Sequence, residues 1–195
     1  LILGLLGYNK YIVEPQEEAA SNELSFPRKH FNNADLAAGS DIDSLLQLGL
    51  DGADNKYGFL DISIQYSGTK AANIANYYAG ISYLKLKEYQ KAIEYLSKFT
   101  SDDEILGPTA LGAIGDAFAD IDQAEDALDY YEKAAYKKDN EFTTPLFLFK
   151  AGRTAMDLGQ FSKAEKIFTQ IKENYSATDS GKDIDKYIYS AKYAQ

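Results

Sequence analysis

The segment that decides the fold begins at Ala79-Gly80-x-x-Tyr83 and is followed by Ala92, Leu96 and Phe99. Two further copies of this pattern follow it along the chain: Leu111-x-x-Ile114-Gly115-x-x-Phe118 with Ala127, Tyr131 and Ala134, and Leu148-x-x-Ala151-Gly152-x-x-Ala155 with Ala164, Phe168 and Ile171. In every copy an alanine follows the glycine by twelve positions, and the glycines at 80, 115 and 152 lie 35 and then 37 residues apart. This period predicts an array of helical repeats.

The pattern resembles the tetratricopeptide repeat (TPR), a helix–turn–helix unit of about 34 residues. The resemblance implies an all-α solenoid with three repeats at about residues 73–106, 108–141 and 145–178. Glycine and alanine are expected where the two helices of a repeat cross, because a larger side chain there would push the helices apart. The recurring aromatic and aliphatic residues then fill the core within and between repeats.

The segments on either side of the repeats are less regular. Asp183 to Ala194 is apolar on one helical face, which predicts a capping helix over residues 183–194 that covers the last repeat. Residues 14–68 are expected to hold a linker helix and a degenerate TPR-like hairpin, so that the array occupies residues 69–195. Within the hairpin the sequence predicts helices near Ser44–Leu50 and Tyr57–Tyr66, joined by a turn at Asp51–Asn55.

The first residues form an apolar run that includes Leu1, Ile2, Leu3, Leu5, Leu6 and Tyr8. Eight residues cannot cross a bilayer, which requires about 20 in a helix. Tyr8 and Tyr11 nevertheless fall where an interfacial belt of aromatic residues would lie. We therefore expect residues 1–13 to be the outer end of a membrane helix that begins upstream of Leu1. The alternative is that this run is a packed helix or strand of a soluble domain.

Two stretches resemble a narrower family. They are Tyr66-Ser67-Gly68-Thr69-Lys70-Ala71-Ala72-Asn73 with Tyr77-Tyr78-Ala79-Gly80, and Ala110-Leu111-Gly112-Ala113-Ile114-Gly115-Asp116-Ala117. Together with the apolar amino terminus they resemble the YfgM-like TPR proteins of Gram-negative bacteria, in a Bacteroidetes-like branch. The resemblance implies a single membrane span in the bacterial inner membrane and a TPR domain in the periplasm. It also implies partners among Sec translocon subunits, periplasmic chaperones or secreted clients.

The composition excludes several other classes of function. Thirty acidic and 20 basic side chains give a net charge of −10, which disfavours binding to nucleic acid. With no cysteine and the single histidine His30, thiolate metal sites and most catalytic triads are excluded, and no cofactor or metal ion is predicted. The acidic pairs lie in turns or on outer helix faces, so we predict a non-enzymatic protein–protein interaction module. A soluble TPR scaffold or co-chaperone without an anchor is the alternative, and self-association is a variant of the first hypothesis. A third alternative, an enzyme or small-ligand binder that uses the concave groove, would require a buried polar cluster that the sequence does not offer.

A TPR array binds partners along the concave face formed by the first helices of its repeats. Counting along those helices predicts six residues of a protein-binding groove: Tyr77, Ile81, Leu84, Asp116, Phe149 and Arg153. The TPR domains that hold the carboxyl terminus of cytosolic heat-shock chaperones use lysine and asparagine where this chain has Tyr77 and Ile81. The groove is therefore expected to prefer a segment with apolar side chains and a basic residue opposite Asp116. The competing interpretation is that these side chains pack between neighbouring repeats.

Overall fold

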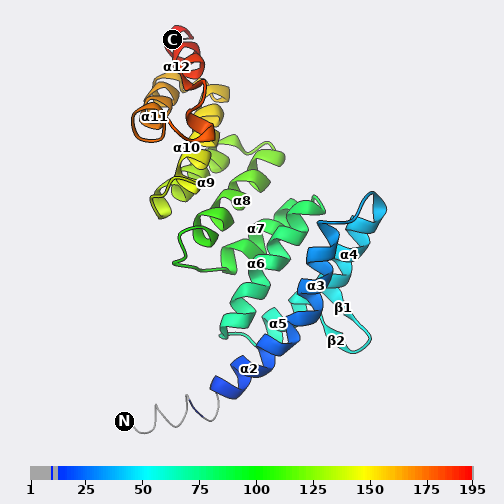
Figure 1. The fold of residues 1–195 in the computed structure, drawn as a ribbon. Coiled ribbons are helices and arrows are strands. Elements are labelled where there is room, and N and C mark those ends of the chain that lie inside the picture. The colour runs from blue at the N-terminus through cyan, green and yellow to red at the C-terminus, as the bar shows by residue number, and fades with distance from the viewer. Residues whose placement is uncertain (1–9, 11–12, 195) are drawn as a thin grey trace. The chain divides into compact units, whose positions relative to one another are not determined.

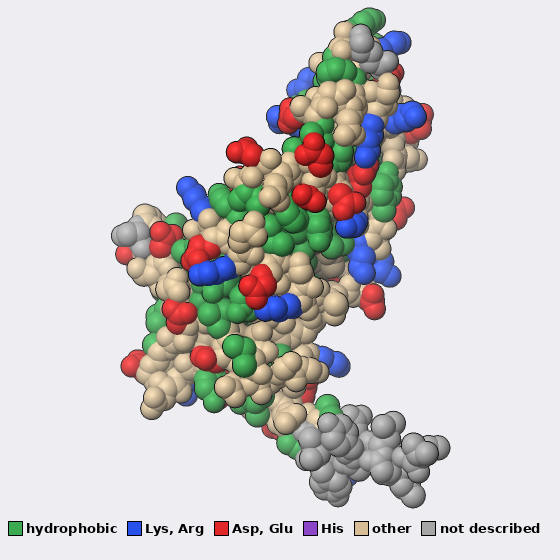
Figure 2. Space-filling model, turned by 180° about the vertical axis from the view of Figure 1, so that it is seen from behind, with side chains coloured by type: hydrophobic (Ala, Val, Ile, Leu, Met, Phe, Trp, Pro, Cys, Tyr) green, Lys and Arg blue, Asp and Glu red, His purple; other side chains and the backbone are tan. Residues whose placement is uncertain are grey.

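The computed structural model describes residue 10 and residues 13–194, and the chain forms two compact units, residues 1–99 and 100–195. Both units are predominantly helical, as the sequence predicts (Figure 1). On the face shown in Figure 2, the described acidic and basic side chains lie interspersed with one another and with exposed hydrophobic side chains.

The second unit consists of two helical hairpins and a final helix. Each helix packs against the next one along the chain, α8 on α9, α9 on α10, α10 on α11 and α11 on α12, which is the arrangement of a helical solenoid. The final helix α12 lies against α11 and confirms the expected cap. The elements are α8 (Leu106–Asp120), α9 (Ala124–Lys137), α10 (Thr143–Asp157), α11 (Phe161–Asn174), the short 3-10 helix η2 (Asp179–Gly181) and α12 (Ile184–Tyr193).

The first unit ends in one hairpin of the same kind, preceded by shorter elements. Helix α3 packs on α4, α5 packs on α6, and α6 forms the repeat hairpin with α7. The elements are α2 (Glu14–Glu23), α3 (Ser25–Ala34), α4 (Ser40–Asp51), β1 (Gly52–Ala53), β2 (Lys56–Tyr57), α5 (Phe59–Gln65), α6 (Lys70–Lys85) and α7 (Tyr89–Lys98).

The connection between α4 and α5 differs from the simple turn that the sequence predicts. It is a two-stranded antiparallel hairpin, in which Gly52 pairs with Tyr57. Asp54 and Asn55 at its tip have φ angles of 50° and 59°. Positive φ at both central residues is the signature of a type I′ turn, which Asp and Asn adopt more readily than most residues. The helix expected from Tyr57 therefore begins only at Phe59, after the second strand.

A carboxylate of helix α2 binds the start of the first repeat. The Glu17 carboxylate accepts hydrogen bonds from the backbone amides of Lys70 and Ala71, at 2.7 and 3.0 Å. These amides lie in the first turn of α6 and have no partner within that helix. A negative charge at the positive end of a helix is also favourable electrostatically. Glu17 thus joins two segments that are more than fifty residues apart.

The repeated glycines allow the close crossing of the two helices in each hairpin. A Cβ atom on Gly80 would lie 2.4 Å from Leu96, one on Gly115 2.7 Å from Tyr131, and one on Gly152 2.5 Å from Phe168. Each clash is with the large residue sixteen positions later, on the second helix of the same hairpin. The alanines that recur twelve positions after each glycine, Ala92, Ala127 and Ala164, are fully buried. Both features follow the repeat pattern of the sequence.

The expected membrane segment cannot be compared with this structure. Leu1, Ile2, Leu3, Leu5, Leu6 and Tyr8 lie outside the described residues. Among the residues that are described, no helix combines the length and the apolar character needed to cross a bilayer.

Candidate functional site

In the first unit, the predicted groove residues lie on α6 and differ in how they are packed. The Tyr77 ring centroid is 5.1 Å from that of Phe99 and 5.6 Å from that of Tyr78. Burial, with a smaller contribution from Tyr78, raises the pKa of the Tyr77 hydroxyl. Ile81 and Leu84 are only partly buried. Tyr77, Ile81 and Leu84 thus all keep some accessible surface, and the ring contacts of Tyr77 give it a packing role as well.

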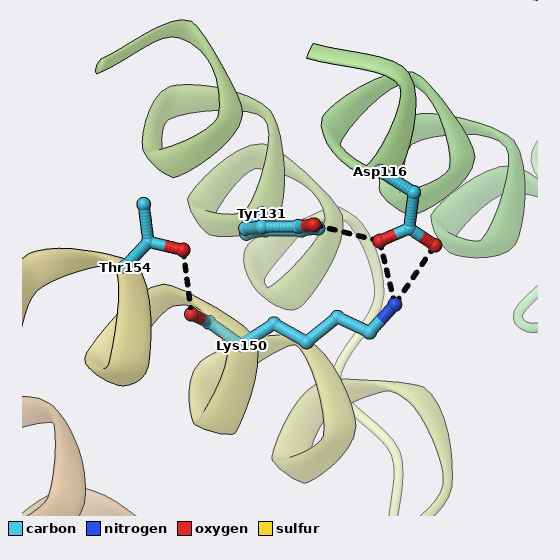
Figure 3. Close-up of polar contacts among 4 residues, drawn as sticks. All are labelled: Asp116, Tyr131, Lys150 and Thr154. Atoms are coloured by element: carbon cyan, nitrogen blue, oxygen red, sulfur yellow. Dashed lines mark hydrogen bonds and ion pairs between the residues drawn. The ribbon is translucent and has the colours of Figure 1, made fainter. Parts of the chain in front are cut away.

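In the second unit, Asp116 lies at the centre of a polar cluster formed by three helices (Figure 3). The Lys150 ammonium group on α10 donates to both carboxylate oxygens of Asp116 on α8, at 2.6 and 2.8 Å. The Tyr131 hydroxyl on α9 donates to the same carboxylate at 2.7 Å. About a third of each charged side chain is exposed, 33% for Lys150 and 35% for Asp116. The cluster ties the two hairpins of this unit together at the protein surface.

Aromatic rings hold Lys150 in this position. Its ammonium nitrogen lies 5.5 Å from the ring centroid of Tyr131 and 5.9 Å from that of Phe147, so a cation–π attraction adds to the ion pair. Phe147 itself lies where a Cβ atom on Gly112 would fall, 1.9 Å from its ring. The absence of a side chain at Gly112 therefore allows Phe147 to pack closely against α8.

The environment of the Tyr131 hydroxyl strongly favours its protonated form. Burial, followed by the hydrogen bond to the Asp116 carboxylate and its negative charge, raises the pKa of Tyr131 far above its ordinary value. Tyr131 therefore remains a hydrogen-bond donor at neutral pH. Lys150 and Tyr131 both donate to the Asp116 carboxylate, so the groups of the cluster are engaged with one another, which fits a structural role.

The remaining two predicted residues lie on α10 in contrasting environments. The Phe149 ring packs edge-on against Tyr187 of α12, with 4.8 Å between centroids, and lies 6.0 Å from Phe168. Phe149 is thus a contact between the third hairpin and the cap. Arg153, one helical turn further along α10, is exposed.

The described residues contain no group of three or more histidine or acidic side chains that could hold a metal ion.

Comparison with known proteins supports the interpretation of the repeats. The sequence model of the Tetratricopeptide repeat family matches residues 75–103 and 147–178, which cover most of the first and third hairpins. The fold is a TPR solenoid. The second hairpin lies outside these matches. Its contact between Gly115 and Tyr131 is equivalent to the glycine contacts in the first and third hairpins.

Two solved structures of a kinesin-light-chain-like protein from Podospora anserina, which has nearly identical TPR-like repeats, are similar to this chain. Their TM-scores are 0.61 and 0.62 at 13% and 12% sequence identity, and each alignment covers 89% of this chain and 85% of the other. Identity this low supports the fold and not a shared partner. No curated protein matches the chain significantly.

Sequence reasoning did not identify Lys150 as part of the site. Lys150 neighbours the predicted position Phe149 and lies 34 residues after Asp116, close to one repeat period. A lysine one repeat period after an acidic residue on a first helix is a signal that could have indicated the pair. The TPR register assigned Asp116 to an open groove. In the structure this carboxylate already has a basic partner within the chain.

Proposed function

We propose that this chain is a non-enzymatic interaction module that binds polypeptide segments along the first helices of its TPR hairpins. The observation that carries this proposal is the repeated hairpin, because stacked repeats of this type present extended surfaces typical of protein-binding scaffolds. The side chains best placed for contact are Ile81 and Leu84 on α6 and Arg153 on α10. Arg153 is exposed and Ile81 and Leu84 are partly exposed, whereas the partly buried rings of Tyr77 and Phe149 are engaged with other aromatic rings. Tyr77 and Phe149 support the same helices from within the packing.

The chemistry of these residues suggests the type of segment that binds. Ile81 and Leu84 favour apolar side chains, whereas the exposed guanidinium of Arg153 favours a carboxylate. A basic residue opposite Asp116 would have to compete with Lys150, which is already bound at 2.6 Å. A segment bound at α6 is therefore expected to be apolar, and a segment bound at α10 to carry an acidic residue opposite Arg153.

The proposal extends to location. The domain is held at the bacterial inner membrane by a single amino-terminal helix and lies in the periplasm, where it assists the Sec translocon, periplasmic chaperones or secreted clients. The apolar run at residues 1–8, the interfacial tyrosines Tyr8 and Tyr11, and the resemblance to YfgM-like proteins support this location.

Photo-crosslinking in native membranes tests the interaction surface. A photoreactive residue is placed at Ile81 or at Arg153, and a control is placed at Glu125, an exposed residue in the first turn of the second helix α9. We expect crosslinks to a discrete partner from the first two positions and none from Glu125. Equal labelling from all three positions would contradict a binding surface on the first helices.

Alkaline carbonate extraction of the full-length protein tests the anchor. A membrane-spanning helix remains in the pellet, whereas a soluble scaffold is released into the supernatant. Release of the protein would rule out the anchor and leave the interaction function to be judged by the crosslinks alone.

A further inference from the structure

The second unit has an apolar edge with acidic residues beside it, formed where its two hairpins begin. The sequence Glu104-Ile105-x-x-Pro108 precedes and enters α8, and Glu141-Phe142-x-x-Pro145 precedes and enters α10 in the same repeat phase. We call the following residues the acidic–apolar edge: Glu104, Ile105, Glu141, Phe142, Leu146 and Asp179.

The backbone presents Ile105 and Phe142 in the same way. The Asp103 carboxylate accepts hydrogen bonds from the amides of Ile105 and Leu106, at 2.9 and 2.7 Å. Asn140, at the equivalent position of the next repeat, accepts hydrogen bonds from the amides of Phe142 and Thr143 at 2.9 and 2.7 Å. The bonds from the Leu106 and Ile105 amides lower the pKa of the Asp103 carboxyl. The bonds to Asp103 and Asn140 fix the two loops without a bound partner protein.

The two loops also lie side by side. The Asn140 side-chain amide donates to the backbone carbonyl of Glu104 at 3.0 Å. This hydrogen bond joins the loop before α8 to the loop before α10. The two acidic–apolar pairs are therefore neighbouring parts of one surface.

The apolar side chains of the edge are unusually exposed. Phe142 is 76% exposed, Ile105 44% and Leu146 43%. Phe142 and Leu146 line a hollow of about 500 Å³, whose opposite wall is formed by residues 177–180 in the connection between α11 and α12. Single exposed apolar residues are common on soluble proteins. Here Ile105 and Phe142 occupy equivalent repeat positions, and Phe142 and Leu146 line the same hollow.

Carboxylates accompany this apolar surface. Glu141 and Asp179 line the hollow, and Glu104 precedes Ile105 on the neighbouring loop. Asp179 is paired with Lys182, whereas within the described part of the chain Glu104 and Glu141 form no ion pair. Lys137 passes close to Gly107 at the start of α8 and partly offsets the negative charge at that end. Glu141, beside Phe142, has no ion-pair partner among the described residues, and its carboxylate favours a cationic occupant.

We propose that the acidic–apolar edge binds a polypeptide segment of a partner protein in which lysine or arginine residues alternate with aliphatic or aromatic ones. The apolar side chains of the segment enter the hollow beside Phe142, and its cations lie against Glu141 and Glu104. This surface consists of the hairpin starts and is separate from the first-helix residues Ile81 and Arg153. The inference rests on the proposed function, because its occupant is a polypeptide.

Three short fluorescent peptides test this inference by anisotropy with the full chain. One alternates lysine with leucine, a second alternates glutamate with leucine, and a third alternates lysine with serine. We expect only the lysine–leucine peptide to bind with measurable affinity. Equal binding of the lysine–serine peptide would overturn the proposal, because charge alone would then suffice, and so would equal binding of the glutamate–leucine peptide.

Matched variants locate the bound peptide. Phe142→Ser is expected to weaken binding about tenfold, because an exposed aromatic anchor is lost. Ile64→Ser is its control, since Ile64 is 68% exposed on α5 in the first unit. Glu141→Lys is expected to weaken the lysine–leucine peptide and to allow the glutamate–leucine peptide to bind, whereas Glu125→Lys should do neither. Unchanged affinity in Phe142→Ser and Glu141→Lys, with native circular dichroism spectra, would overturn the assignment.

Three further outcomes separate this inference from the function proposed above and from self-association. If the peptides fail to bind while crosslinks from Ile81 and Arg153 persist, the edge is not a binding site and the first-helix surface remains. If Phe142→Ser abolishes peptide binding while those crosslinks are absent, the edge is the binding surface and the first-helix proposal fails. If Phe142→Ser instead abolishes dimer formation in sedimentation and the peptides do not bind, the occupant is a second copy and the inference is wrong.

Discussion

Replacing Gly152 by alanine tests the packing feature on which the repeat depends. At an exposed helix position this change stabilises a protein by about 1 kcal/mol. Here the new Cβ would lie 2.5, 2.8 and 3.0 Å from three ring atoms of Phe168, all within the repulsive range. Overpacking of a core typically costs about 1–3 kcal/mol. The net effect depends on whether the Phe168 ring can move.

The surroundings of Phe168 indicate that it cannot move freely. The ring has no exposed surface, and it lies 6.0 Å from Phe149 and 5.4 Å from Tyr187 between centroids. The upper part of the overpacking range therefore applies. After subtraction of the helix-propensity gain, we expect Gly152→Ala to destabilise the second unit by about 1–2 kcal/mol.

Urea unfolding followed by circular dichroism measures this loss. Because the chain has two compact units, amide hydrogen exchange in α10 and α11 is needed to assign the change to the second unit. Phe168→Leu provides the matched second site. When combined, the two substitutions should cost at least about 1 kcal/mol less than the sum of their separate effects, because the smaller side chain relieves the clash. A neutral Gly152→Ala variant, or strictly additive losses, would refute the reasoning.

Three further predictions follow from individual residues. Because the pKa of Tyr131 is raised in the folded chain, the Tyr131 hydroxyl loses its proton above about pH 10 only in the unfolded chain. The free energy of unfolding should therefore fall by up to about 1.4 kcal/mol per pH unit above that pH. Tyr131→Phe should flatten this slope, as measured by urea midpoints at several alkaline pH values. Asp122 has a φ of 60°, so Asp122→Gly should raise the free energy of unfolding by about 1 kcal/mol. Gly159→Ala at the equivalent turn should lower it by a similar amount, and thermal unfolding measures both changes. Glu17→Gln should accelerate amide exchange in α2 and cost about 0.5–1 kcal/mol, because the charged cap of α6 is lost; unchanged exchange would contradict the role of Glu17.

The repeat pattern predicts the hairpins well because it reports local steric needs. A glycine and an alanine twelve residues apart identify the close crossing of two helices. The structure adds the large side chain that requires the glycine, such as Phe168 for Gly152. The turns within the repeats, at Lys87, Asp122 and Gly159, each have a residue of positive φ at the equivalent position. Only the last of these is glycine, so the residue type at this position does not by itself indicate all three turns.

The first unit was harder to predict because long-range contacts determine much of it. Glu17 caps a helix more than fifty residues away, and no local pattern indicates the backbone amides that donate to it. The sequence predicts a turn at Asp54–Asn55 but not the two strands beside it, which contain only two residues each. Such short strands have no alternating apolar pattern to detect.

The predicted site shows the same limit at the level of single side chains. Counting along a first helix gives the face on which a residue lies, but not which side chain of the next helix covers it. Phe149 has the expected position, yet Tyr187 of the cap packs against it. The interpretation that Phe149 packs against a neighbouring helix therefore applies to it, whereas Arg153, one turn later, remains exposed.

The Asp116–Lys150 pair explains why an acidic residue at a groove position need not create an acidic groove. Lys150 contacts both carboxylate oxygens and lies over two aromatic rings, so it is held close to Asp116 before any ligand arrives. A ligand cation would lose translational freedom on binding and would also have to displace this intramolecular partner. With both charges only about one-third exposed, a displaced Lys150 would lose its compensation in a partly desolvated position. Recognition by α8 and α10 is therefore determined less by the charge of Asp116 than by the exposed side chains around the pair.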